Sequence, residues 1–294
     1  MPMQDGQELT LELLPRLAPA LAARIEGLGE HAPADLTAAN LWLFRRAHGY
    51  RYHPGEWPVV SGKSYDGQAH AIPLFDPSSA PVAVLHGYIA SYGSLFPLTM
   101  REAGALKRKG YTITSHRDDA DYVYTAETFA SYPGRALQYK RSLSKQFTSG
   151  HEVRTQVYSS QLQAEALAVL DGWMRDKAKA AGEADDLPCR EALAHASELG
   201  LEGVVVEANG EPAGFLLAEH SQPGVWVIRF AKGLAKFNGV AQFLFRQFAQ
   251  EPPARCEWMN FEQDLGLANF RRTKLSYGPK LMPQKWRASW SRAS

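Results

Sequence analysis

The segment 202–220, EGVVVEANGEPAGFLLAEH, constrains the fold of this chain more than any other stretch. Two arms rich in β-forming residues flank Asn209 and Gly210, a dipeptide that favours a tight hairpin turn because both residues tolerate positive φ. A strand is expected next at 225–233, then a helix at 239–251 and a second strand at 256–264. A hairpin, a strand, a helix and a strand are therefore expected to follow one another in this half of the chain.

Upstream of this hairpin, the pattern predicts a strand at 151–159 and helices at 163–180 and 190–199, separated by the polar linker AGEADDLPC. A short helix at 267–278 is expected to close the chain's second half, because Gly278 followed by Pro279 is a typical helix end.

The first half of the chain shows a similar order of elements. Helices are expected at 9–25 and 37–48, and 57–76 reads as a hairpin that turns at Asp66 and Gly67. One or two further strands are expected within 81–97, followed by a helix at 101–110 and a strand at 111–117. With a boundary near Gly150, we predict two domains of mixed α/β structure, 1–150 and 151–294.

Composition is typical of a globular protein that buries a sizeable core. Hydrophobic residues make up 45% and charged residues 21% of the 294 residues. The 32 basic and 31 acidic residues give a net charge of +1, so nucleic-acid or membrane partners must be sought in local patches.

Cysteine usage, short motifs and the character of the N-terminus bear on the location and cofactors of the protein. The two cysteines, Cys189 and Cys256, form neither a disulfide framework nor a CxxC metal site, and no HExxH or GxxxxGK[ST] motif is present. The N-terminus has acidic residues where a signal peptide needs basic ones, and the uncharged stretch 77–100 is broken by prolines and glycines. We therefore expect a cytoplasmic protein without a metal, which would approach any inner-membrane acceptor from the surface.

The stretch 256–287 combines an acidic strand with a basic helix. If 256–264 is extended, Asn260, Glu262 and Asp264 share one face, while Met259 and Phe261 point to the other. Neighbouring carboxylates on that face would lie about 6–7 Å apart, close enough to share one amine. Solvated charges on an exposed strand and helix are the plain structural alternative.

The pattern NxEQDxG followed by FRRxKxSYxP, over residues 260–279, resembles the C-terminal domain of bacterial phosphatidylglycerol lysyltransferases and related stand-alone proteins. Weaker similarities lie at 121–147 and 202–217. The resemblance implies two tandem domains of the GCN5-related N-acetyltransferase (GNAT) type, each a mostly antiparallel central sheet flanked by helices. It also implies transfer of an amino acid from aminoacyl-tRNA, a co-substrate rather than a bound cofactor, to an acceptor.

In this fold two parallel strands separate at their ends, and the acyl carbonyl lies in the gap, where a backbone N–H can stabilise an oxyanion. The resemblance assigns these strands to 225–233 and 256–264. We expect Glu262 and Asp264 to hold the aminoacyl ammonium or act as base, and Tyr277 to act as general acid. The substrate-binding residues expected around them are Asn260, Arg229, Lys232, Arg271 and Lys274, the last two facing phosphate.

A second candidate binding surface lies on the helix at 135–147. Residues 135–154 contain five basic residues and one acidic residue. Tyr139, Lys140, Arg141 and Lys145 could grip a tRNA acceptor end, with the tyrosine stacking on a base. The structural alternative is an ordinary solvated helix.

The sequence also leaves two other functions open. An acyl-CoA-dependent N-acetyltransferase would need a glycine-rich pyrophosphate loop, but AKGLAKFNGVAQ has only Gly233 and Gly239, at unsuitable spacing. A non-catalytic binding protein of the same fold is the other alternative. The lysyltransferases also carry a membrane-embedded domain that is not seen in this sequence, so a lipid, a peptide and a small molecule all remain candidate acceptors.

Overall fold

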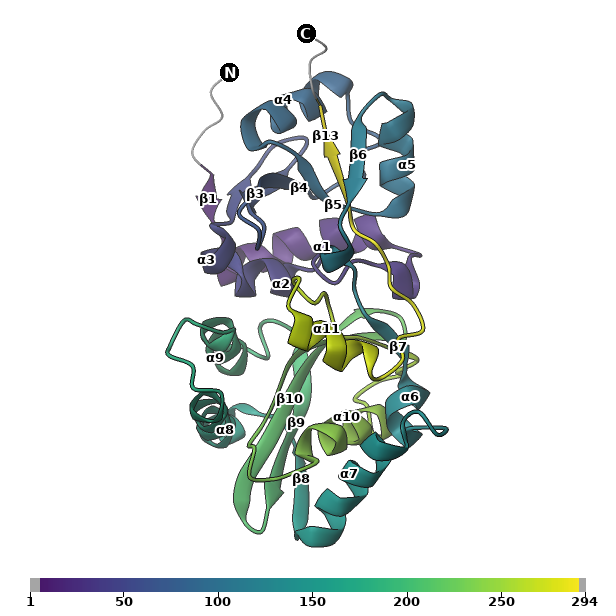
Figure 1. The fold of residues 1–294 in the computed structure, drawn as a ribbon. Helices are drawn as coiled ribbons and strands as arrows, with labels where there is room; N and C mark the ends of the chain where they lie inside the picture. The colour runs from purple at the N-terminus through teal and green to yellow at the C-terminus, as the bar shows by residue number, and fades with distance from the viewer. Residues whose placement is uncertain (1–5, 291–294) are drawn as a thin grey trace. The chain divides into compact units, whose positions relative to one another are not determined.

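The computed structural model describes residues 6–290, which form two compact units (Figure 1). Unit 1 contains the chain up to Asp121, then Gln263–Arg272 and the segment that begins at Met282. Unit 2 contains Tyr122–Glu262 and Thr273–Leu281. The chain therefore contributes three separate segments to unit 1, and each unit is described by itself below.

Unit 1 is built on a seven-stranded sheet. In spatial order its strands are β1 (Gln7–Glu8), β2 (Arg51–His53), β3 (Val59–Lys63), β4 (Ala69–Pro73), β5 (Leu95–Leu98), β13 (Trp286–Ser289) and β6 (Thr112–Ser115). Only β4 and β5 pair in parallel; every other neighbouring pair is antiparallel. The predicted hairpin at 57–76 is confirmed as β3 and β4.

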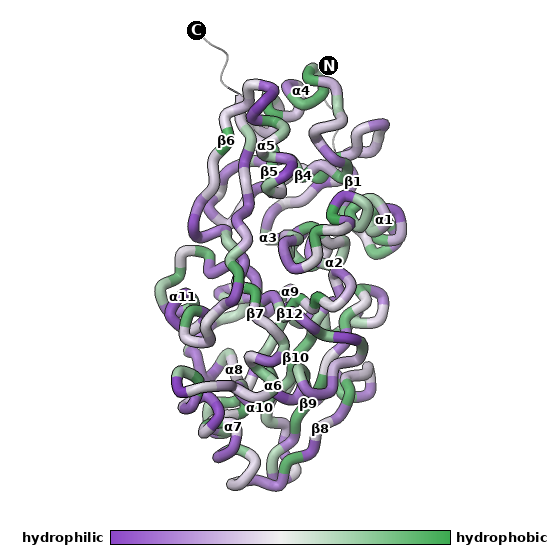
Figure 2. Tube along the Cα trace, turned by 90° about the vertical axis from the view of Figure 1, so that its right-hand side faces the viewer, coloured by the Kyte–Doolittle hydropathy of each residue, from purple (hydrophilic) through white to green (hydrophobic). Residues whose placement is uncertain are grey.

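The helices of unit 1 are α1 (Leu14–Ile25), α2 (Ala38–Leu43), α3 (Arg45–His48), α4 (Val82–Tyr92) and α5 (Met100–Arg108). The predicted caps are present: the Thr37 side chain accepts a hydrogen bond from the Asn40 N–H, and Gly49 ends α3 with φ +60°. Leu17, Leu21 and Ile25, the apolar residues whose spacing predicted α1, are buried, and Figure 2 shows both hydrophobic and hydrophilic residues along this helix.

The prediction of strands within 81–97 was wrong for most of that segment. Residues 82–92 form α4, and only β5 is extended. The many Val, Ile and Tyr residues favour strands locally, but parallel strands β4 and β5 need a crossover, and a helix supplies it. Leu85 and Ile89, four residues apart, lie on the buried side of α4.

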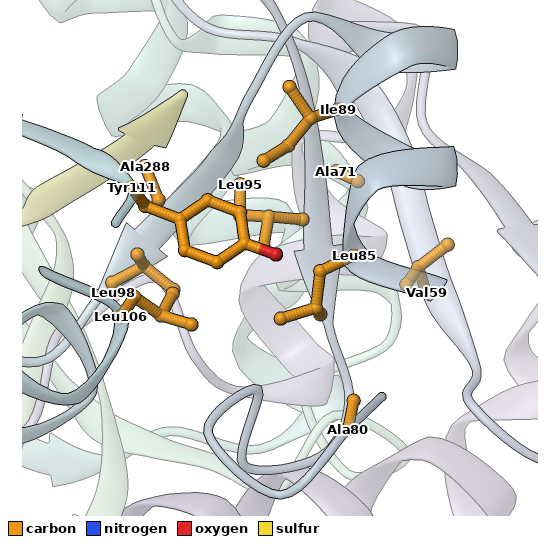
Figure 3. Close-up of a cluster of buried hydrophobic side chains, with 10 residues drawn as sticks. All are labelled: Val59, Ala71, Ala80, Leu85, Ile89, Leu95, Leu98, Leu106, Tyr111 and Ala288. Carbon is orange, nitrogen blue, oxygen red and sulfur yellow. The ribbon is translucent and has the colours of Figure 1, made fainter. Parts of the chain in front are cut away.

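The core of unit 1 gathers side chains from the sheet, α4 and α5 (Figure 3). Leu85, Leu95, Leu98 and Leu106 are fully buried there. The ring of Tyr111 lies among them, and its hydroxyl oxygen points into the apolar cluster.

Unit 2 is built on a six-stranded sheet with the same general plan. Its order is β7 (Val123–Thr125), β12 (Trp258–Asn260), β11 (Val225–Gly233), β10 (Glu211–Gln222), β9 (Leu201–Ala208) and β8 (Val153–Val157). Again one pair, β11 and β12, is parallel, and the crossover helix between them is α10 (Val240–Gln250). The predicted turn is confirmed, with φ of +53° at Asn209 and +78° at Gly210.

The other helices of unit 2 are α6 (Ala126–Ser131), α7 (Gln138–Gly150), α8 (Gln163–Asp176) and α9 (Asp186–Ala194), and α11 (Ala268–Leu275) is divided between unit 1 up to Arg272 and unit 2 from Thr273. Helices α6 and α7 pack on α10, which groups 122–150 with unit 2. The predicted ranges of the two GNAT-like domains, 1–150 and 151–294, stay a prediction.

Candidate functional site

The end of the parallel pair in unit 2 brings several predicted site residues together. Strands β11 and β12 pair at three positions, the last being Val227 opposite Asn260. Beyond this point β12 ends, whereas β11 continues to Gly233. The two strands expected at the reaction centre are therefore parallel neighbours, as predicted, and their pairing stops where the polar residues begin.

The expectation of a regular strand through 264 was wrong. Glu262 has φ +58° and Leu265 has φ +56°, so the alternation of side chains breaks after Asn260. Left-handed φ at a residue other than glycine costs about 1–3 kcal/mol and persists only where neighbouring groups hold it. The chain turns here because its own polar groups stabilise a turn better than an extended strand.

Hydrogen bonds fix the backbone of Glu262 on both sides. Its N–H donates to Asn260 Oδ1 at 2.7 Å. Its carbonyl accepts from the Tyr122 N–H at 3.2 Å and from Lys274 Nζ at 3.2 Å. Lys274 Nζ also donates to the Phe261 carbonyl at 2.7 Å. Glu262 is thus held in one strained conformation at the strand end.

The carboxylate of Glu262 is held by Arg229. The register of β10 and β11 shifts between Leu217 and Ala218, which leaves Arg229 as the extra residue of a β-bulge. Bulges redirect side chains and are common beside active sites. The guanidinium, whose side chain is 0% exposed, contacts Glu262 Oε1 through Nη1 and Glu219 Oε2 through Nε and Nη2.

Electrostatics keep this buried arginine charged. Burial lowers the pKa of Arg229, but the nearby carboxylates of Glu219 and Glu262 outweigh it, and the net direction is upward. One guanidinium and two carboxylates carry a net charge of −1. The side chains of Glu219 and Glu262 retain 13% and 23% exposure, so both carboxylates are partly open to solvent while the guanidinium is not.

Asp264 belongs to unit 1 and has different partners. It is 0% exposed and accepts two hydrogen bonds from Arg271, at 2.8 and 3.0 Å. It also contacts Arg117 Nη1 at 3.4 Å and accepts the Gly266 N–H at 2.9 Å. Each carboxylate is held by a different arginine, Glu262 by Arg229 and Asp264 by Arg271, and their expected shared contact with a substrate amine stays a prediction.

The two predicted phosphate ligands of α11 contact the protein itself. Arg271 bridges Asp264 and Asp118, and these hydrogen bonds raise its pKa. Lys274 donates to the two backbone carbonyls described above. Phosphate binding by Arg271 and Lys274 stays a prediction. To bind a phosphate, each side chain would have to share or give up its hydrogen bonds to the protein.

Lys232, at the far end of β11, lies in a separate set of contacts. Its ammonium donates to both carboxylate oxygens of Asp185, at 2.7 and 2.8 Å, and lies 4.1 Å from the Trp173 ring centre. Lys236, in the loop that follows, pairs with Glu211. An acyl-CoA-dependent enzyme would bind pyrophosphate at residues 231–242. Both lysines of this segment, Lys232 and Lys236, are paired with carboxylates.

Tyr277, the predicted general acid, lies in an aromatic cluster of unit 2. Its ring is close to those of Phe129, Phe245 and Tyr132, and its hydroxyl accepts a hydrogen bond from Gln242 at 2.9 Å. Burial raises the pKa of Tyr277 to about 12, so the hydroxyl keeps its proton at neutral pH. With 5% exposure, it presents little surface to a substrate.

The basic helix α7 presents part of its predicted surface to solvent. Tyr139 is 70% exposed, and Lys145 is also exposed. Arg141 donates to the carbonyls of Tyr132 and Gly134, whereas the Lys140 ammonium lies 4.3 Å from the Tyr277 ring centre. Partial burial lowers the pKa of Lys140.

Sequence reasoning missed Glu219 and Gln242. Both lie in correctly predicted elements, but neither belongs to a recognisable motif. The hairpin register could have suggested Glu219, since it places the residue opposite Val227, two positions from Arg229. Nothing in the sequence pointed to Gln242.

Two further properties bear on possible ligands. Within residues 6–290, no group of three or more His, Cys, Asp or Glu side chains is arranged to hold a metal ion. None of the helices in that same part of the chain has both the length and the apolar character needed to cross a bilayer.

The two sheets define the class of this protein. Each is mostly antiparallel, is flanked by helices and contains one parallel pair joined through a helix, the architecture of tandem GNAT-type acyltransferases. Residues 27–289 match the family described as phosphatidylglycerol lysyltransferase, C-terminal, and the chain belongs to this family. Membership supports an acyltransferase and, in general terms, aminoacyl transfer.

Solved structures share the fold along nearly the whole chain. A conserved protein of unknown function from Bacteroides thetaiotaomicron has a TM-score of 0.82 at 19% identity, covering 97% of this chain and 99% of its own. The C-terminal domain of a putative lysylphosphatidylglycerol synthetase from Agrobacterium fabrum gives 0.65 at 15%, covering 97% and 94%. L-PGS from Bacillus licheniformis gives 0.64 at 16%, covering 99% and 95%. None of the curated protein sequences matches this chain.

Proposed function

We propose that this protein transfers an amino acid from aminoacyl-tRNA to an amine or hydroxyl group of a lipid, peptide or small-molecule acceptor. The observation that carries the proposal is the constrained Glu262, whose backbone is strained and whose carboxylate is held by a buried arginine at the end of the parallel pair. Such strain is retained where a function requires it. Family membership supports aminoacyl transfer in general.

The proposed reaction needs few groups from the protein, because an aminoacyl ester is already electrophilic. The acceptor nitrogen or oxygen forms a bond to the ester carbonyl carbon, and the bond between that carbon and the terminal ribose oxygen breaks. The acceptor loses one proton, and the leaving ribose hydroxyl gains one. The residues must orient the two substrates, move this proton and stabilise the developing oxyanion.

Glu262 is the residue we favour for the central role. Its carboxylate is partly exposed, which suits contact with either the donor's α-ammonium or a proton from the acceptor. Asp264 and Tyr277 remain candidates for the same chemistry. The bidentate arginine on Asp264 and the aromatic enclosure of Tyr277 favour positioning and packing roles for them.

The donor's tRNA is proposed to contact α7. An exposed tyrosine beside basic residues suits single-stranded nucleic acid, because the ring stacks on a base while cations neutralise phosphates. Tyr139 and Lys145 have the exposure that this role needs. Lys140 and Arg141 also contact unit 2 itself and would support the helix as well as the ligand.

Coenzyme A is the less favoured donor. The N-terminus of α10, where a pyrophosphate would be expected, is closely approached by α7: a Cβ on Gly239 would lie 2.2 Å from the Leu143 carbonyl oxygen. Lys232 and Lys236 are both paired with carboxylates. These contacts leave the loop with little capacity for a diphosphate.

The decisive experiment supplies labelled aminoacyl-tRNA and, separately, labelled acetyl-CoA to the purified protein with candidate acceptors. We expect loss of label from tRNA, and a fall of roughly a hundredfold or more in the Glu262→Gln variant, the size typical of a lost acid–base group. Glu207→Gln, which alters another carboxylate of the same sheet, is the control and should retain the rate. Consumption of the thioester alone would reject the proposal, as would binding of aminoacyl-tRNA without turnover.

A further inference from the structure

Glu219 is the second carboxylate on the Arg229 guanidinium. Its Oε2 accepts from Nε at 2.9 Å and from Nη2 at 2.6 Å. Glu262 Oε1 accepts a hydrogen bond from Nη1 of the same guanidinium. Because a guanidinium is planar and its donors form a fixed fork, fixing two of its nitrogens also fixes the direction of the third.

The burial of Arg229 makes this arrangement rigid. Its side chain is 0% exposed, so water cannot replace a lost partner at the guanidinium. The bulge at Arg229 also removes it from the regular register of β10 and β11. The hydrogen bonds from the Glu219 side chain on β10 therefore hold Arg229 in place where regular strand pairing is interrupted.

We propose that Glu219 is a positioning residue for the transfer reaction: it holds the Arg229 guanidinium, which in turn orients the Glu262 carboxylate. This inference rests on the proposed function of Glu262. Glu219 lies in a different strand from Glu262, and the Arg229 guanidinium connects the two carboxylates.

The Glu219→Gln variant tests the proposal with little change in shape. The amide keeps an acceptor but loses the charge that strengthens both hydrogen bonds. We expect kcat to fall about ten- to a hundredfold, the scale of an ångström-sized misplacement of a reacting group, with KM for aminoacyl-tRNA nearly unchanged. Glu219→Asp, which keeps the charge on a shorter side chain, should show an intermediate loss.

A double-mutant cycle separates positioning from general damage to the fold. If Glu219 acts through Glu262, adding Glu219→Gln to Glu262→Gln should change the rate less than twofold, an expectation of non-additivity. If the two losses multiply instead, the proposal is overturned. Glu207→Gln again serves as the control within the same sheet.

A measurement without substrates distinguishes this inference from the proposed function. The Glu262 N–H donates to Asn260, and its exchange with deuterium reports how firmly the turn is held. We expect faster exchange in residues 258–262 of Glu219→Gln, with the rest of unit 2 unchanged. If the wild type transfers no amino acid, the proposed function fails and exchange alone decides: faster exchange supports the positioning role, and unchanged exchange overturns it.

Discussion

Replacing Lys285 with methionine should destabilise unit 1 strongly. Lys285 is 1% exposed, and its ammonium contacts Asp35, Asp121 Oδ1 at 2.8 Å and Gln263 Oε1 at 2.6 Å. These partners come from the first and second segments of unit 1, whereas Lys285 belongs to the third. One buried cation thus joins all three segments.

The magnitude follows from what the substitution leaves behind. Methionine fills a similar volume but leaves Asp121, which is 0% exposed, beside Asp35 without the ammonium. Removing one partner of a buried ion pair typically costs about 3–5 kcal/mol, because the remaining charge stays desolvated. We therefore expect the free energy of unfolding to fall by at least about 3 kcal/mol.

The pH dependence of this contribution has a defined sign. Burial lowers the pKa of Lys285, but Asp121 and Asp35 outweigh it and raise the pKa above the ordinary lysine value. The stabilisation is therefore complete at neutral pH and is lost only as pH rises through the alkaline range above about 10.

Urea unfolding followed by far-UV circular dichroism at pH 7 would test this prediction. The control is Lys236→Met, which removes an exposed ion pair with Glu211 and should cost less than about 1 kcal/mol. Adding Asp121→Asn to Lys285→Met should recover part of the loss. A Lys285→Met protein within 1 kcal/mol of wild type would refute the reasoning, and so would a double variant no more stable than the single one.

Two other predictions concern buried groups of unit 1. Among residues 6–290 the buried Tyr111 hydroxyl finds no hydrogen-bond partner, so Tyr111→Phe should stabilise the protein by about 1 kcal/mol in the same assay. Tyr158→Phe, which removes a hydroxyl bonded to the Leu193 carbonyl, is the contrast and should destabilise it; equal effects would contradict the argument. Burial lowers the pKa of His70 to about 4. As pH falls below 6.5, the unfolded chain therefore binds a proton at His70 that the folded chain does not yet bind, and this favours unfolding. Between pH 7 and 4 this should remove about 3 kcal/mol of stability, and His70→Gln should lack that part of the slope. The exposed His31→Gln should behave as wild type, and an unchanged slope in His70→Gln would show that another group is responsible.

Local patterns predicted most elements because their signals lie within a few residues of one another. The turn at Asn209 and Gly210, the Thr37 cap and strand 225–233 all depend on neighbouring side chains and on backbone preferences. Strand and helix propensities failed at α4, where the crossover between parallel strands decides the conformation. They failed again after Asn260, where a local hydrogen bond to the Asn260 side chain and others from Tyr122 and Lys274 hold Glu262 in a left-handed turn.

The sequence by itself determined the mixed α/β class, the hairpins and the neighbourhood of Asn260 and Glu262, because each follows from short-range chemistry in an ordered series of elements. Only the tertiary structure decided which charges meet. Glu219 reaches Arg229 from the adjacent strand, and Asp264 pairs with Arg271 rather than sharing a partner with Glu262. Buried charges must be compensated by opposite charges nearby in space, and spatial neighbours are set by packing and register over the whole chain.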